Sequence, residues 1–215
     1  MKIKALLFDM DGLVLDTEKL YTRFWQEAAG ALGFPMTKEQ ALGMRSLNRG
    51  AGADKLKSYF GDSVDYDAVR KKRIELMDAF VAANGVSLKP GIHELLIFAK
   101  EQGIKTAITT SSPMERTRCY LSQVGLVDAF DELVSGYMVE KGKPEPDIYL
   151  YAAKILGGKP CECMVLEDSP AGILAAHRAG CIPVMIPDQD EPDEATKKLL
   201  FACVDRLDLV SELLS

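Results

Sequence analysis

The feature of this sequence that most constrains the fold is an alternation of short apolar runs with longer helical segments, which begins at about residue 90. The runs at 105–109, 132–135, 164–166 and 182–186 have apolar residues at their centres and are typical of strands. The segments between them, at 90–100, 113–123, 146–156 and 170–179, are typical of helices that begin at a proline. Strands that alternate with helices predict a parallel sheet that is covered on both faces.

A fifth apolar run, at residues 4–8, is separated from the others by a long segment without a convincing strand. Asp16-Thr17-Glu18 has the composition of a helix start, and from there to about residue 86 apolar residues recur at helical spacing. We therefore expect an all-helical block of about seventy residues, inserted after the first strand of an α/β sheet.

Two acids, Asp9 and Asp11, come directly after this first strand, and Gly12 ends the run. Side chains two positions apart on an extended strand point the same way, so both carboxylates can face one site. Because negative charge is costly at the end of a buried strand, a bound cation is the usual remedy. The alternative is a turn with two solvated acids.

Polar side chains also follow the other strands, at the edge of the sheet where ligands bind in open parallel sheets. These segments are Thr109-Thr110-Ser111-Ser112, Lys141-Gly142-Lys143-Pro144 and Glu167-Asp168-Ser169. Hydroxyls and N–H groups at a helix start can hold phosphate oxygens, and a lysine can offset their charge. Carboxylates, with water and phosphate, are the ligands that Mg²⁺ prefers. The set predicts phosphoryl transfer with Mg²⁺.

Together these segments form four separated motifs, which resemble the haloacid dehalogenase-like superfamily in its phosphatase and phosphosugar mutase branch. The motifs are Asp9-Met10-Asp11-Gly12 with Asp16-Thr17-Glu18, then 109–112, then 142–147, then 167–172. The resemblance covers nearly the whole chain. It implies a Rossmann-like core at 1–18 and 87–215, with a helical cap at 19–86 inserted after the first strand.

The resemblance also implies a role for each matching residue. Asp9 matches the nucleophile that forms an aspartyl-phosphate, and Asp11 matches the general acid and base. The residues that match the family's phosphate-binding groups are Thr110, Ser111 and Lys143. Those that match its Mg²⁺ ligands are Asp9, the backbone carbonyl of Asp11, Glu167 and Asp168. Three basic residues of the cap are candidate substrate contacts or, equally, solvated charges: Arg45, Arg49 and Lys72.

The expected activity is Mg²⁺-dependent hydrolysis of a small phosphorylated metabolite, with a sugar phosphate as the leading substrate. A β-phosphoglucomutase-type mutase is the main alternative. The mutases of this branch carry a histidine where this chain has Tyr21, and that departure favours hydrolysis. A dehalogenase is disfavoured by Asp11 and the full set of acids. A non-enzymatic, receiver-like phosphoacceptor module is disfavoured by the helical insertion.

Composition narrows the remaining classes. The chain has 215 residues, 47% of them hydrophobic, which suits a soluble globular protein with a sizeable core. Its net charge of -6 disfavours a nucleic-acid partner. We find no apolar stretch that would form a signal peptide or a membrane span, and the five cysteines predict reduced thiols, so we expect a cytoplasmic protein. The acidic run at 188–194 is interpreted as a solvated surface loop. A monomer or a small homo-oligomer is compatible with these observations.

Overall fold

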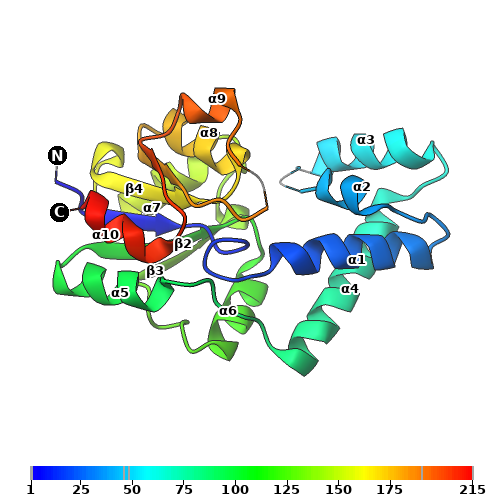
Figure 1. Cartoon of the computed structure of the whole chain (residues 1–215), viewed down its shortest axis with the longest axis horizontal. Helices are drawn as coiled ribbons and strands as arrows, with labels where there is room; N and C mark the ends of the chain where they lie inside the picture. Colours follow the sequence, from blue (N-terminus) through cyan, green and yellow to red (C-terminus); the bar gives the residue numbers. More distant parts are fainter. Residues whose placement is uncertain (1, 46, 48, 190, 215) are drawn as a thin grey trace. The chain divides into compact units, whose positions relative to one another are not determined.

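The computed structural model describes residues 2–45, 47, 49–189 and 191–214, and the chain divides into two compact units (Figure 1). The first, which we call the core unit, comprises residues 1–16 and 87–215, and the second, which we call the helical unit, comprises residues 17–86. In the described part of the chain, none of the helices combines the length and the apolar character that crossing a membrane requires.

The core unit contains a six-stranded parallel sheet in the order β3-β2-β1-β4-β5-β6. Its strands are β1 (Ala5–Phe8), β2 (Lys105–Thr110), β3 (Glu132–Ser135), β4 (Cys163–Glu167), β5 (Ile182–Met185) and β6 (Ala202–Cys203). β1 is central and all four of its residues are buried, as expected of a parallel sheet whose two faces are both covered. The predicted α/β fold with a parallel sheet is confirmed.

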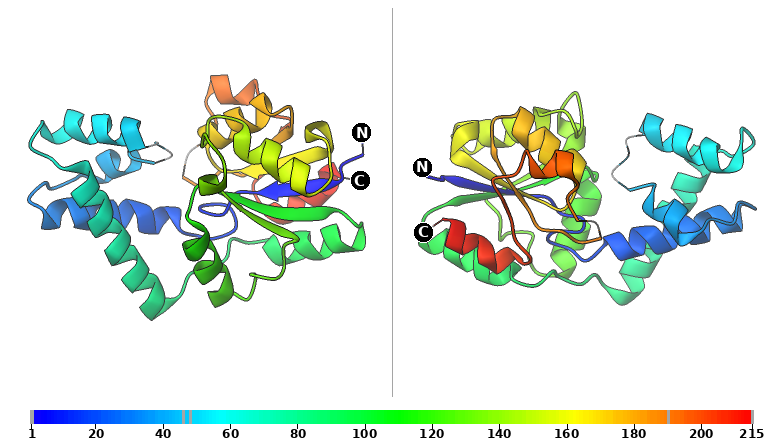
Figure 2. Two further views of the ribbon diagram at one scale, coloured as in Figure 1. Left: turned by 180° about the vertical axis from the view of Figure 1, so that it is seen from behind. Right: turned by 45° about the horizontal axis from the view of Figure 1, so that its top comes forward.

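Helices cover both faces of this sheet, with α7 and α8 on one face and α5 on the other (Figure 2). The helices of the core unit are α5 (Ile92–Glu101), α6 (Met114–Gln123), α7 (Asp147–Ile155), α8 (Pro170–Arg178), α9 (Glu194–Lys197) and α10 (Val210–Leu213), with short 3-10 turns η1 (Gly136–Met138), η2 (Pro160–Glu162) and η3 (Leu207–Leu209). Small alanine side chains of α7 and α8 pack against Leu7, Ala107 and Val165 of the strands. This close packing supports the strand ends that carry the polar residues.

One sequence interpretation is wrong at Asp188. The run 188–194 was expected to be a solvated loop, yet the Asp188 side chain is only 6% exposed. It forms an ion pair with Lys89, whose Nζ lies 2.5 Å from Oδ1. The same run ends in structure rather than loop, because Asp193 caps α9 by accepting a hydrogen bond from the Thr196 N–H.

The two segments that lead out of the core unit lie side by side. The Asp16 N–H donates to the Ser87 carbonyl, and the Lys89 N–H donates to the Val14 carbonyl, each at 2.9 Å. Leu15 lies between these two contacts and forms an antiparallel bridge with Leu88. The helical unit is therefore inserted through one paired connection.

The helical unit contains α1 (Glu18–Ala31), α2 (Lys38–Leu42), α3 (Arg49–Phe60) and α4 (Tyr66–Asn84), and its described residues include no strand. α1 and α4 pack against one another and cross at an angle (Figure 1). Their shared core is apolar and includes Trp25, Ala28, Leu56 and Val69. Asp65 is the N-cap of α4, and its side chain accepts hydrogen bonds from the N–H groups of the first turn, a preferred arrangement.

Candidate active site

The predicted catalytic acids lie at the carboxyl edge of the sheet because of strand register. Phe8 pairs with Ile108 on one side and with Leu166 on the other, so β1, β2 and β4 end at the same level. Asp9 follows β1 directly, and its N–H still donates to the Leu166 carbonyl at 3.0 Å. Side chains from three strands that are far apart in the sequence thus meet at one edge.

Lys143 contacts polar groups that follow or end three strands at this edge of the sheet. Its Nζ lies 2.6 Å from Oδ1 of Asp9, 2.5 Å from Oε1 of Glu167 and 2.9 Å from the Thr109 carbonyl oxygen. The Lys143 side chain is 8% exposed. Burial alone would lower the pKa of Lys143, but Asp9 and Glu167 raise it well above its usual range, so the ammonium group stays charged. The lysine is therefore a fixed positive charge beside Asp9.

The surroundings of Asp9 disfavour its negative charge more than Lys143 alone can offset. The pKa of the Asp9 carboxyl group is raised from 3.8 to about 7, chiefly by burial and also by Glu167 and Asp11, against the opposing effect of Lys143. The Asp9 side chain is 11% exposed, so it reaches solvent at the sheet edge. A cationic or proton-donating partner at this edge would stabilise the ionised form of Asp9.

Glu167 is fully buried, and both of its carboxylate oxygens accept hydrogen bonds from the protein. Oε1 accepts from Lys143 and, at 2.8 Å, from the Tyr149 hydroxyl. Oε2 accepts from the Ser169 N–H at 3.1 Å and from the Ser169 hydroxyl at 2.9 Å. With this many donors, the Glu167 carboxylate is held in a fixed position. In this arrangement Glu167 anchors Lys143.

Tyr149 is a member of this site that the sequence reasoning missed. It is completely buried, it donates to Glu167, and its ring centroid lies 5.3 Å from the Lys143 Nζ. Burial and the neighbouring Glu167 raise its pKa well above the usual range, which keeps the hydroxyl protonated as a donor. Tyr149 occupies an apolar position of α7, so the sequence pattern predicts an ordinary core residue there. Its position six residues after Lys143 is the feature of the sequence that could have indicated a role in the site.

The segment after β2 forms a rigid polar turn. Thr110 is buried, and its Oγ1 accepts a hydrogen bond from the Ser112 N–H at 3.0 Å. Ser111 is exposed. The Ser112 hydroxyl donates to Oδ2 of Asp11 at 2.9 Å, although the sequence reasoning gave Ser112 no role. The structure thus brings the predicted phosphate-binding segment and Asp11 together.

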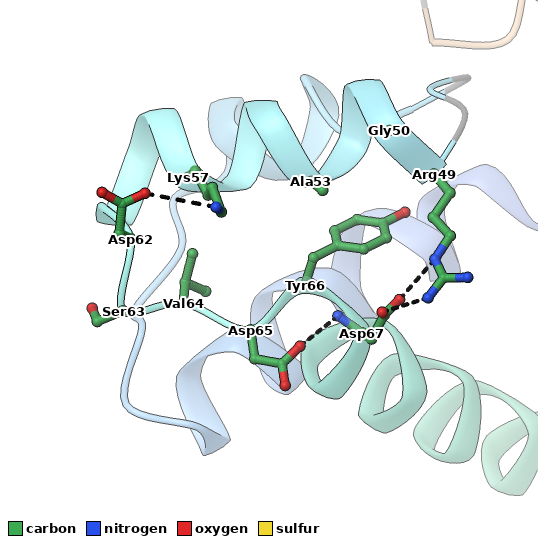
Figure 3. Close-up of a pocket in the computed structure, with 10 residues that line it drawn as sticks. All are labelled: Arg49, Gly50, Ala53, Lys57, Asp62, Ser63, Val64, Asp65, Tyr66 and Asp67. Carbon is green, nitrogen blue, oxygen red and sulfur yellow. Dashed lines mark hydrogen bonds and ion pairs between the residues drawn. The ribbon is translucent and has the colours of Figure 1, made fainter.

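The predicted substrate contacts Arg45, Arg49 and Lys72 all lie in the helical unit. Arg49 is exposed and forms a bidentate ion pair with Asp67, with Nη2 at 2.5 Å from Oδ2 and Nε at 3.1 Å from Oδ1 (Figure 3). Both residues line an open groove of about 610 Å³ between α3 and the start of α4. Because Asp67 already offsets its charge, Arg49 is less suited to clamp an anion.

Lys72 and Arg45 are half-buried, and Arg45 Nε lies 3.4 Å from the Leu42 carbonyl oxygen. The next residue after Lys72, Arg73, is instead the buried cation of α4. Its guanidinium carbon lies 4.7 Å from the ring centroid of Tyr21 and 5.0 Å from that of Trp25. Tyr21, at the position expected from the sequence to match the histidine of the mutases, is therefore a packing partner of Arg73.

The sequence model of the haloacid dehalogenase-like hydrolases matches residues 3–180. The chain belongs to this family. Family membership and relatives named as phosphatases identify it as a phosphatase-type enzyme. The predicted family resemblance and enzyme class are thereby confirmed.

Relatives within the family carry both phosphatase and mutase names. The chain is 33% identical over 180 residues to the phosphorylated carbohydrates phosphatase of Thermotoga maritima, which covers 83% of this chain and 82% of that protein. It is 28% identical to the β-phosphoglucomutase of Bacillus subtilis, covering 85% of this chain and 82% of that protein. The crystal structure of CbbY from Rhodobacter sphaeroides in complex with phosphate matches with a TM-score of 0.79 and 27% identity, over 96% of this chain and 95% of that one.

Proposed function

We propose that this protein is a Mg²⁺-dependent phosphomonoester hydrolase that acts on a small phosphorylated sugar or a related metabolite through an aspartyl-phosphate on Asp9. The observation that carries the proposal is the contact of Lys143 with Asp9 at 2.6 Å and with Glu167 at 2.5 Å. This arrangement places a charged lysine beside a carboxylate at the solvent edge of the sheet, where a phosphoryl group can approach both.

In the first step, an oxygen of Asp9 attacks phosphorus while the bond from phosphorus to the ester oxygen breaks. Asp11 donates a proton to the leaving oxygen, which departs as an alcohol. Thr110, Ser111 and Lys143 hold the oxygens of the transferring group. In the second step, Asp11 takes a proton from water, the water oxygen attacks phosphorus, and the bond to Asp9 breaks to release phosphate.

The donor set fits Mg²⁺. The described residues include no ready-made cluster of three or more His, Cys, Asp or Glu side chains, and Mg²⁺ needs only one or two carboxylates with water and substrate oxygens. Asp9, the carbonyl of Asp11 and Asp168 are the groups that we assign to it. Glu167 supports the site through Lys143 and Ser169, because both of its oxygens already accept protein hydrogen bonds. When bound, the ion would offset charge on the phosphoryl group.

We assign the helical unit the role of a cap that selects the substrate, which follows the organisation expected from the family resemblance. Sugar phosphates are the leading substrate class because a relative that is 33% identical is named for phosphorylated carbohydrates. The protein would then meet its substrate in the cytoplasm as a small free metabolite.

The experiment that tests this function measures phosphate release from p-nitrophenyl phosphate and from a panel of sugar phosphates, with and without Mg²⁺. We expect turnover that requires Mg²⁺ and is abolished in Asp9→Asn. Turnover that survives Asp9→Asn would refute the covalent route. A stable phosphorylated protein that does not turn over would instead support a phosphoacceptor module.

A mutase is the second candidate, because a relative that is 28% identical is named β-phosphoglucomutase. The discriminating assay supplies β-glucose 1-phosphate together with the corresponding bisphosphate and follows both glucose 6-phosphate and inorganic phosphate. Hydrolysis predicts steady release of phosphate with no isomerised product. Accumulation of glucose 6-phosphate would favour the mutase, in spite of Tyr21.

A further inference from the structure

We propose that Ser112 is a positioning residue for the general acid, which holds the carboxyl group of Asp11 in the orientation needed for proton transfer. The inference rests on the proposed function, in which Asp11 protonates the leaving oxygen. Its basis is the hydrogen bond from the Ser112 hydroxyl to Oδ2 of Asp11, at 2.9 Å. The two residues are 101 positions apart in the chain, so the contact depends on the tertiary fold.

Ser112 is itself held at three atoms. Its N–H donates to Thr110 Oγ1 at 3.0 Å, and its carbonyl oxygen accepts from the Ser135 hydroxyl at 2.6 Å. Its own hydroxyl is directed at Asp11, and the whole residue is 6% exposed. Because the ends of β2 and β3 both restrain Ser112, its hydroxyl is a fixed donor for the Asp11 carboxyl group.

The orientation of the Asp11 carboxyl group matters for the proposed chemistry. It lies beyond the end of β1, in the turn that precedes the paired connection to the helical unit, and it is half-buried. The terminal torsion of a carboxyl side chain has a broad energy profile, so the group can turn unless a partner holds it. A general acid must lie within hydrogen-bond reach of the leaving oxygen, and a misplacement of about 1 Å can cost about a hundredfold in rate.

The same residue also links two parts of the proposed chemistry. Through its N–H it shapes the Thr110 turn that is assigned to the phosphoryl group, and through its hydroxyl it orients Asp11. The acid is therefore set relative to the position of the ester that it protonates. Ser112 touches neither substrate nor phosphorus in this scheme, which is why we class it as a positioning residue.

The test compares two esters, because only one of them needs a strong acid. A sugar phosphate leaves as an alkoxide that must be protonated, whereas p-nitrophenyl phosphate leaves as a stable phenolate. For an aspartyl-phosphate route, kcat/KM reports the steps up to the first transfer to Asp9, so the later attack of water does not enter it. We expect Ser112→Ala to lower kcat/KM for the sugar phosphate by about tenfold to a hundredfold, and for the aryl ester by no more than about threefold.

Three further variants make the comparison specific. Ser112→Thr keeps the hydroxyl and should recover most of the activity on the sugar phosphate. Ser122→Ala is the matched control, because that hydroxyl donates to a carbonyl within α6, far from Asp11 in sequence, and it should change neither ester by more than about twofold. In an Asp11→Asn background, Ser112→Ala should add no further loss, because the residue acts through Asp11.

Equal losses on both esters, or a full additional loss in the Asp11→Asn background, would overturn the inference while leaving the proposed function intact. Absence of any turnover by the wild type would refute the proposed function and the inference together. Thermal unfolding of each variant shows whether it is folded, and Ser112→Cys, which keeps the size of the side chain with a weaker donor, replaces Ser112→Ala if the latter does not fold. Ser112→Cys should then show the same selective loss on the sugar phosphate.

Discussion

Replacement of Gly172 by alanine should disrupt the site by displacing Glu167, without replacing any side chain of the site itself. A Cβ at this position of α8 would lie 1.9 Å from Cδ and Oε1 of Glu167, and 2.4 Å from Oε2. Cβ atoms in proteins essentially never approach another heavy atom closer than 3.0 Å. The buried carboxylate would have to move by about an ångström, and it would give up contacts with Lys143, Tyr149 or Ser169 as it moved.

The expected cost follows from two effects of opposite sign. Forcing an extra atom into a packed interior costs about 1–3 kcal/mol, and disrupting a buried ion pair costs about 3–5 kcal/mol when it is complete. Alanine in place of glycine within a helix returns about 1 kcal/mol. We expect Gly172→Ala to lower the free energy of unfolding by about 3–7 kcal/mol. It should also lower phosphatase activity by at least about a hundredfold, because Glu167 would no longer hold Lys143 in place.

Gly30→Ala is the matched control. Gly30 also lies in a helix, α1, and a Cβ there would meet no heavy atom within 4 Å. This change should stabilise the protein by about 0.5–1 kcal/mol. Urea denaturation followed by far-UV circular dichroism measures both variants, and hydrolysis of p-nitrophenyl phosphate measures their activity. A Gly172→Ala variant with the stability and activity of the wild type would refute the packing of Glu167 against Gly172.

Three more outcomes follow from the same contacts. The pKa of Asp9 is raised from 3.8 to about 7, chiefly by burial, so in metal-free protein its contribution to stability is complete below pH 4 and is lost as the pH rises through 7. Asp9→Asn should therefore stabilise the protein by about 2–4 kcal/mol at pH 8 but hardly at pH 4. Equal gains in urea denaturation at both pH values would contradict this expectation. Tyr149→Phe removes a buried hydrogen bond to the Glu167 carboxylate, and it should lower the free energy of unfolding in urea by about 1.5–3 kcal/mol. Tyr151→Phe, in the same helix, should lower it by less than half of that. Among the five free thiols, Cys163 and Cys181 are buried, with pKa values raised by burial to about 11 and 12, so a thiol reagent should label three cysteines rapidly in native protein and all five only after unfolding.

The sheet could be predicted because most of its strands are short, have apolar residues at their centres and are separated by helices that begin at or near prolines. β6 was not predicted, because Ala202–Cys203 contains only two residues and pairs at the edge of the sheet. Asp188 was misjudged for a different reason. Its partner Lys89 lies 99 positions away, and no local pattern distinguishes an acid that forms a buried ion pair from one that is solvated.

The same distinction between local and distant information applies to the site. The motifs around Asp9 and Lys143 are local and could be recognised, whereas the contacts of Tyr149 and Ser112 are made across the fold. Tyr149 has the spacing of a core residue in α7, and Ser112 belongs to a run that also suits a helix start. In α4, periodicity alone could not separate Lys72 from the adjacent Arg73, although only Arg73 is buried against Tyr21.

The paired connection at residues 14–16 and 87–89 has a consequence for the order of folding. β1 is the central strand, yet Ala5 pairs with Lys105, so the sheet can form only after a loop of about a hundred residues closes. The packing of α1 against α4 uses contacts within that loop, and the hydrogen bonds of the paired connection bring its two ends to the same place. Once the helical unit has folded, most of the loop-closure entropy has been lost before β1 meets β2. An insertion that lies outside the sheet in the sequence thus becomes the element that allows the sheet to nucleate.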